Sequence, residues 1–202
     1  MKLWYSPPSP FVRKVLMLAY ETGQIDKLEL VDVSNTALTP DAELAKLNPL
    51  GKIPTLILED GHTLFDSRVI SEYLDGLHDG KKMLPAEGMD RYNVLVCQAM
   101  GDGIMETAVA IRYEQALRPQ EFQWNVWMDA QQKKIVQALD VLETWRAGRL
   151  QDIHLGSISV ASALSYLDFR QPDFNWREGR PVLMQMLATF SERESMLKTK
   201  AE

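Results

Sequence analysis

The pattern of apolar residues along this chain changes near residue 80. Before that point, short extended runs alternate with segments of helical period. Asp60-Gly61 joins two of the extended runs, which predicts a hairpin because glycine accepts a positive φ. Strands are predicted at 3–5, 27–33 and on both sides of this turn within 53–65, and helices at 10–20, 41–48 and 66–77. The resulting order, β-α-β-α-β-β-α, predicts an α/β domain.

Beyond a polar linker at 78–88, every periodic segment is helical. The stretch 158–167 has no charged residue, and a helix that is apolar all round is typical of the buried axis of a bundle. The sequence therefore predicts two domains, an α/β domain at 1–79 and an all-α domain at 88–202.

Charge and side-chain chemistry exclude several classes of function. A net charge of −6 argues against a nucleic acid as partner. The single cysteine, Cys97, rules out an internal disulfide and reads as a buried apolar residue. His62, His78 and His154 are scattered without the spacing of metal ligands. With no apolar signal run and no expected membrane span, a cytoplasmic protein that binds neither metal nor membrane is predicted.

Ser9-Pro10 stands where the first strand turns into the first helix. Serine is a preferred N-cap and proline a preferred first helical residue, so the pair can be a simple helix cap. The same corner also directs free N–H groups and the positive end of the helix dipole at whatever lies above it. A bound thiol there would be stabilised as its thiolate.

Two further motifs have both structural and functional readings. Ile53-Pro54 enters a strand, where proline indicates an edge position or a cis bond, and a cis bond would leave the backbone of Ile53 available to an extended peptide. Asp66-Ser67 stands between a strand and a helix, so one of the two can cap that helix. Alternatively, Asp66 can bind a ligand ammonium group while Ser67 and the helix N-terminus bind its carboxylate.

With these three motifs in register and a helical second half, the chain resembles the glutathione transferase superfamily over nearly its whole length. Two segments, "DGIMETAVAIRYEQALRP" and "SALSYLDFR", resemble a bacterial subgroup of these enzymes. The resemblance implies a thioredoxin-like first domain with a mixed sheet, an all-helical second domain and a homodimer.

The resemblance also implies roles in binding glutathione, γ-Glu-Cys-Gly. Asp66 and Ser67 would hold the γ-glutamyl head, and Ile53 would pair its backbone with the cysteinyl unit beside a cis Pro54. Lys52 would favour the glycyl carboxylate, although an exposed lysine after Gly51 is more often just solvated.

Ser9 is the candidate for activating the thiol, because it aligns with the redox cysteine of glutaredoxin-like relatives. Ser6 and Tyr5 remain alternatives, since relatives use an earlier serine or a tyrosine near the first strand. Phe11 is expected to contact glutathione, and Phe11 and Met105 to line the pocket of a small apolar electrophile, unless they are ordinary core residues.

Three functions stay open on the sequence alone. The first is a detoxifying glutathione transferase without metal. The second is a glutathione-dependent dehalogenase, peroxidase or isomerase, and the third a non-catalytic binding or regulatory protein. One departure from the family concerns the helix at 158–167: its usual Ser/Thr-x-x-Asp capping box is replaced by His154 and Ser157, which predicts a helix start weaker by about 1 kcal/mol unless Asp152 or Ser157 compensates.

Overall fold

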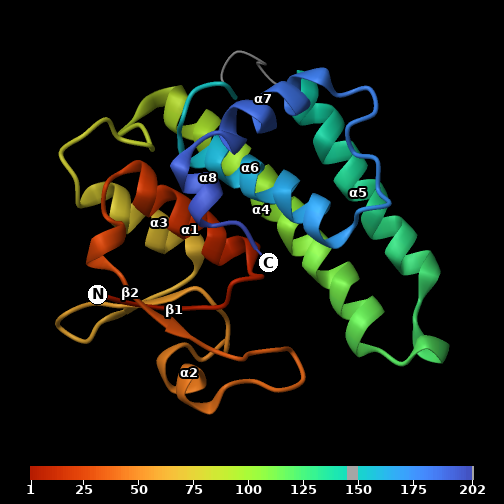
Figure 1. Cartoon of the computed structure of the whole chain (residues 1–202), viewed down its shortest axis with the longest axis horizontal. Coiled ribbons are helices and arrows are strands. Elements are labelled where there is room, and N and C mark those ends of the chain that lie inside the picture. Colours follow the sequence, from red (N-terminus) through yellow and green to blue (C-terminus); the bar gives the residue numbers. More distant parts are fainter. Residues whose placement is uncertain (145–149, 202) are drawn as a thin grey trace. The chain divides into compact units, whose positions relative to one another are not determined.

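The computed structural model describes residues 1–144 and 150–201. They form two compact units, one from Met1–Leu84 together with the C-terminal segment that begins at Arg193, and the other from Pro85–Glu192. Figure 1 shows the strands in the first unit and the long helices of the second.

The first unit is built on a four-stranded sheet that is mixed, as the resemblance implies. Its strands lie in the order β2-β1-β3-β4, with β1 parallel to β2 and antiparallel to β3, and β3 antiparallel to β4. The strands are β1 (Lys2–Tyr5), β2 (Glu29–Asp32), β3 (Thr55–Ile57) and β4 (Thr63–Leu64). The predicted turn at Asp60-Gly61 joins the last two, with Gly61 at φ +88°.

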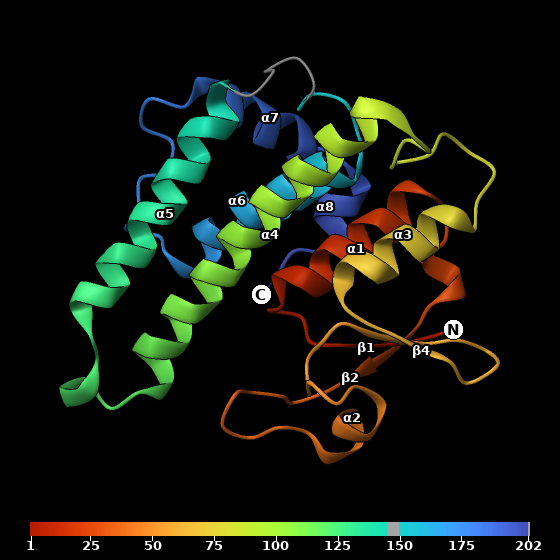
Figure 2. The same ribbon diagram turned by 180° about the vertical axis from the view of Figure 1, so that it is seen from behind.

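Helices cover both faces of this sheet. α1 (Pro10–Glu21) and α3 (Ser67–Gly76) lie on one face and α2 (Ala42–Leu47) on the other, with the short 3₁₀ helix η1 (Ile25–Lys27) before β2 (Figures 1 and 2). Apolar side chains of the sheet and of the two covering helices are fully buried, among them Leu3, Val15, Leu18, Leu56 and Ile70.

The C-terminal segment returns to the first unit, whereas the sequence analysis placed it in the helical domain. α8 (Glu194–Lys198) packs on α1, and two arginines hold it there. Arg193 donates two hydrogen bonds to Glu21 at 2.7 and 2.6 Å, and Arg13 donates to the Met196 carbonyl at 3.2 Å. The difference arises because helical periodicity does not reveal which surface a terminal helix packs against.

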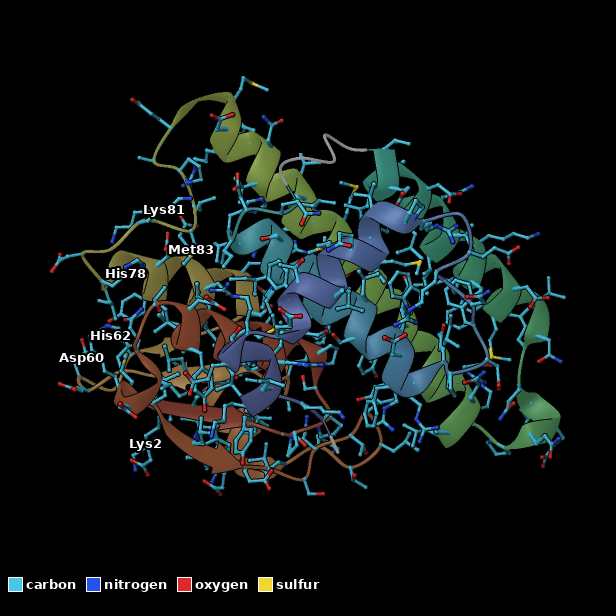
Figure 3. The ribbon with its side chains drawn as sticks, turned by 45° about the horizontal axis from the view of Figure 1, so that its top comes forward. Lys2, Asp60, His62, His78, Lys81 and Met83 are labelled. Carbon is cyan, nitrogen blue, oxygen red and sulfur yellow. The ribbon has the colours of Figure 1, made fainter. Side chains whose placement is uncertain are left out.

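Where the chain leaves the first unit, the buried carboxylate of Asp75 fixes the linker. It accepts from the backbone N–H groups of Met83 and Leu84 at 2.7 and 3.0 Å and lies 3.0 Å from Nε2 of His78. Figure 3 labels His78 and Met83 here, together with Asp60 at the β3–β4 turn. The β3–β4 turn lies at the end of the strands opposite the one where Ser9, Ile53 and Asp66 lie.

The second unit is helical: α4 (Gly88–Leu117), the 3₁₀ helix η2 (Gln120–Phe122), α5 (Asn125–Thr144), α6 (Leu155–Arg170) and α7 (Pro181–Ser191). α6 is buried along most of its length, which confirms the predicted axis. It packs closely on α4, since a Cβ added at Gly101 would lie 2.7 Å from the Ser159 carbonyl carbon. A Cβ at Gly156 would lie 2.7 Å from Cβ of Cys97.

The structure bears on two expectations about these helices. By length and composition α4 could cross a membrane, although no membrane span was expected; half of its apolar window is buried, as in the core helix of a soluble protein, so this is weak evidence for a span. The start of α6 is not weakened, because Ser157 compensates, which is one of the two alternatives that the sequence left open. His154 Nδ1 accepts from Ser157 N at 3.1 Å, and Ser157 Oγ accepts from His154 N at 3.0 Å, a complete capping box built with histidine.

Candidate functional site

The three sequence motifs lie at one end of the strands in the first unit, where β1 and β4 end and β3 begins. Trp4 pairs with Thr55, so the carboxyl end of β1 lies beside the start of β3. Leu64 pairs with Leu56, so the carboxyl end of β4 lies at the same end of the sheet. Ser9-Pro10 follows β1, Ile53-Pro54 precedes β3 and Asp66-Ser67 follows β4. Antiparallel pairing therefore brings together residues that are up to 58 positions apart in the sequence.

Ser9 is the N-cap of α1, with Pro10 at the first helical position, as the sequence predicts. Its Oγ accepts a long hydrogen bond from Val12 N at 3.4 Å, and its backbone N donates to the Ser6 carbonyl at 3.1 Å. Because this hydroxyl accepts, its own hydrogen is available to a group above the corner. Tyr5 ends β1 and Ser6 is half-buried in the same loop, so both alternative activators lie nearby.

Ile53 presents an unpaired backbone N–H and C=O at the same end of the strands. The Ile53-Pro54 bond is cis, as predicted, and neither the N–H nor the C=O of Ile53 hydrogen bonds to another group within the described residues. An extended peptide can therefore pair with it as an added strand. Ile53 is half-buried and Pro54 is buried.

Asn48 holds this loop, and the sequence analysis did not identify it. Its buried side chain donates to the Lys52 carbonyl at 2.9 Å and to Thr55 Oγ1 at 3.1 Å, and it accepts from Leu50 N at 3.0 Å. Asn35 donates to the Gly51 carbonyl at 2.9 Å from the segment after β2. The sequence offers little to identify such a residue, because an asparagine before a proline is equally typical of a turn.

Asp66 and Ser67 divide the two roles that the sequence left open. Asp66 is the N-cap of α3, where its Oδ1 accepts from Arg68 N at 2.9 Å, and it is exposed. Its second carboxylate oxygen accepts no hydrogen bond from the residues that the structure describes, so it is available to a ligand cation. Ser67 is buried at the first position of the helix, and its hydroxyl makes no hydrogen bond within the described part of the chain. Together with the helix N-terminus, this hydroxyl suits a carboxylate.

The remaining predicted residues occupy ordinary environments. Lys52 is exposed, Phe11 is half-buried on α1 and Met105 is fully buried on α4. Burial raises the pKa of the Cys97 thiol to about 12, so this cysteine is no nucleophile at neutral pH. The described residues contain no group of three or more His, Cys, Asp or Glu side chains that could hold a metal ion.

Comparisons with known proteins give the same assignment in both halves of the chain. The family profile "Glutathione S-transferase, N-terminal domain" matches residues 8–77, and "Glutathione S-transferase, C-terminal domain" matches residues 125–185. An Escherichia coli K12 protein described as an uncharacterized GST-like protein, YibF, is 34% identical over 202 residues, which cover 98% of each chain.

Solved structures extend the similarity to the whole chain. A glutathione transferase family member from Pseudomonas fluorescens Pf-5, with bound glutathione, is 45% identical with a TM-score of 0.98, over 100% of this chain and 98% of that one. A structure from the same source with bound S-(propanoic acid)-glutathione is 43% identical with a TM-score of 0.93, over 100% of both chains. A glutathione S-transferase from Methylobacillus flagellatus with glutathione bound is 32% identical with a TM-score of 0.87, over 100% and 99%.

Proposed function

Since this chain belongs to the glutathione transferase superfamily, we propose that it binds glutathione in its first unit, at the end of the sheet where β1 and β4 end and β3 begins. We propose further that it activates the thiol for attack on small electrophiles. The observation that carries this proposal is the hydroxyl of Ser9, which caps α1 by accepting a hydrogen bond and keeps its hydrogen for a thiolate. Glutathione bound to the Pseudomonas relative supports the choice of ligand.

The free energy that activation requires is within reach of this corner. A free thiol has a pKa of about 8.5, so lowering the pKa by about two units requires roughly 2.7 kcal/mol of preferential thiolate stabilisation. A hydrogen bond to a charged group contributes about 1.5–3 kcal/mol, and a helix N-terminus about 0.3–1 kcal/mol. Ser9 at the start of α1 supplies both.

The rest of glutathione matches polar groups of Ile53, Asp66 and Ser67 at the same end of the strands. We assign its cysteinyl backbone to the N–H and C=O of Ile53, beside Pro54, and its γ-glutamyl ammonium to the second oxygen of Asp66. The γ-glutamyl carboxylate would accept from Ser67 and the α3 N-terminus. Lys52 and Phe11 stay proposed contacts of glutathione.

For the second substrate, Phe11 and Met105 stay candidate pocket residues, and we propose that the ligand set includes a carboxylate-bearing conjugate such as the one bound by the Pseudomonas relative. Further proposals from the family are a homodimer, a bacterial source, a cytoplasmic location and a role in detoxification. A serine in place of a cysteine at position 9 disfavours mixed-disulfide chemistry there, which is why conjugation is favoured over thiol exchange.

The test is turnover of glutathione with a generic aromatic halide, and with a peroxide for the second class of activity. Ser9→Ala should lower kcat/KM for the conjugated substrate roughly 30- to 100-fold, as the loss of about two pKa units implies. Ser6→Ala, in the same loop, is the matched control and should retain most of the activity. Equal losses in both variants would contradict the assignment, and a parent protein that binds glutathione but turns over none of the substrates would favour a non-catalytic role.

A further inference from the structure

Arg13 lies one helical turn after Ser9 on α1. Its backbone N donates to the Ser9 carbonyl at 3.0 Å. Residues four apart are neighbours on one side of a helix, and a long side chain leans back toward the helix N-terminus. The guanidinium of Arg13 is therefore carried on the side of Ser9 and of the start of α1. The side chain is half-buried, so it does not simply extend into water.

The C-terminal segment of the first unit holds this guanidinium in place. Nε of Arg13 donates to Thr199 Oγ1 at 3.3 Å, and Nη2 donates to the Met196 carbonyl at 3.2 Å. Thr199 Oγ1 in turn donates to the Ser195 carbonyl at 2.6 Å, which fixes the acceptor of Nε. The third nitrogen, Nη1, donates no hydrogen bond within residues 1–144 and 150–201.

α8 runs antiparallel to α1, and this direction brings its end to the start of α1. Arg193, just before α8, binds Glu21 in the last turn of α1, whereas Thr199, just after α8, binds Arg13 near the first turn. Figures 1 and 2 both show the segment after α8 beside the first turns of α1. The C-terminal segment therefore meets α1 at the corner that carries Ser9, and all of these residues belong to the first unit.

No carboxylate compensates the charge of Arg13 within the described residues. Its acceptors are a hydroxyl, a carbonyl and, at 3.7 Å, the sulfur of Met196, and all three are uncharged. Burial lowers the pKa of Arg13 and no carboxylate raises it, whereas the hydrogen bonds and charge of Glu21 raise the pKa of Arg193. A guanidinium stays protonated in proteins all the same. α1 thus carries, near its start, a partly desolvated positive charge without an ion-pair partner.

The acidic side chains on α1 and on the elements packed against it do not supply the missing partner. Glu21 is engaged by Arg193, and Asp75 is engaged by backbone N–H groups of the linker. The other acidic side chains are exposed, and in the described part of the chain none lies within ion-pair distance of Arg13: Asp26, Glu72 and Glu194. The exposed lysines of the C-terminal segment, Lys198 and Lys200, have the same sign as Arg13.

We propose that Arg13, held by Thr199 and Met196, favours a negative charge on the sulfur of glutathione bound at Ser9. The inference rests on the proposed function, because it takes the sulfur to lie at Ser9. Burying an uncompensated charge costs free energy, so a thiolate one helical turn away is favourable. A separation on the order of 10 Å and an effective dielectric constant of about 40 give a shift of roughly half a pKa unit. This is about a threefold larger thiolate fraction near neutral pH, in addition to the effect of the Ser9 hydroxyl.

The first measurement is the pKa of the thiol of bound glutathione, from its ultraviolet absorbance. Arg13→Gln removes the charge and keeps a side chain that can donate to the Met196 carbonyl, and it should raise this pKa by about half a unit. Arg13→Lys keeps the charge and should leave the pKa within about 0.2 units of the parent value. Arg193→Gln is the matched control, since it removes the same charge and loosens α8 at the other end of α1, and it should leave the thiol pKa unchanged.

The second measurement separates this inference from activation of the thiol. Glutathione sulfonate carries a permanent negative charge where the thiol would lie, and S-methylglutathione carries none. In calorimetric titrations, Arg13→Gln should weaken binding of the sulfonate about threefold relative to S-methylglutathione, as half a pKa unit implies. Arg13→Lys should keep the relative affinities of the parent.

If Arg13→Gln changes neither the thiol pKa nor the preference for the sulfonate, the role of Arg13 is overturned and the proposed function stands. Equal losses in Arg13→Gln and Arg13→Lys, or an equal effect of Arg193→Gln, would also overturn it, because the charge at this position would then not matter. A parent protein that binds neither analogue contradicts both the proposed function and this inference. A parent that binds both analogues but leaves the thiol at its free pKa contradicts activation alone, and the ratio of the two affinities then decides the role of Arg13.

Discussion

Replacing Gly101 with alanine is expected to separate α4 from α6. The new Cβ would lie 2.7 Å from both the carbonyl carbon and Oγ of Ser159 and 2.8 Å from Val160 N. Two of these three atoms are helix backbone, so no side-chain rotation relieves the contact. Ser159 Oγ also donates to Asp102 at 2.7 Å in a buried position, and the helix shift would break that bond.

The magnitude follows from three opposing contributions. Overpacking a well-packed core costs about 1–3 kcal/mol, and losing a buried hydrogen bond to a carboxylate costs about 1–3 kcal/mol. Alanine is the better helix former by about 1 kcal/mol, which offsets part of the loss. We expect Gly101→Ala to lower the free energy of unfolding by about 2–4 kcal/mol, and Tm by roughly 5–15 °C for a chain of this size.

Gly103→Ala is the matched control, two residues further along the same helix. Apart from its chain neighbours and the backbone of its own helix, no atom of the described residues lies within 4 Å of its added Cβ. The helix propensity of alanine should therefore stabilise the protein by up to about 1 kcal/mol. Thermal unfolding followed by circular dichroism measures both variants against the parent. If Gly101→Ala is as stable as Gly103→Ala, close packing of α4 against α6 at Gly101 is refuted, because the expected difference between the two variants comes from the contacts of the added Cβ.

Asp66→Asn should keep the cap on Arg68 N and the stability while weakening glutathione binding about tenfold or more in calorimetry, whereas Asp66→Ala should also lose about 1 kcal/mol of stability. Cys97, with a pKa of about 12, should react with an aromatic disulfide at pH 8 only after unfolding; prompt labelling of the native protein would contradict its burial. Burial opposes ionisation of Glu21, but the hydrogen bonds from Arg193 and Ser195 and the charge of Arg193 outweigh it and lower the pKa of Glu21. The stabilisation is therefore present near neutral pH and is lost as pH falls below about 4, so Arg193→Gln should destabilise the protein at pH 7 and differ less from the parent at pH 3.

Local signals explain why so much of the first unit could be predicted. Asp60-Gly61 marks the hairpin, and Ser9-Pro10 marks the start of α1, because both motifs act through the backbone of their own neighbours. The positions of the three motifs on the secondary structure were predictable for the same reason, because each motif stands at a strand end. The order and direction of the strands then bring those ends together.

Contacts between distant segments were not predictable in the same way. The side chains of Arg13 and Arg193 bind partners more than 170 residues away, which no helical period encodes. His154 was expected to weaken α6, because histidine is not among the preferred caps, yet its ring nitrogen accepts as a serine hydroxyl would. Asn48 satisfies a loop backbone that becomes apparent only once the loop has its shape.

The central claim is that Ser9 stabilises the thiolate of bound glutathione. The ultraviolet absorbance of the thiolate, titrated with pH on the parent and on Ser9→Ala with glutathione bound, tests it most directly. We predict a thiol pKa about two units below its free value in the parent and close to the free value of about 8.5 in the variant. A parent titration at the free value, or a lowered pKa that persists in Ser9→Ala, would contradict the claim.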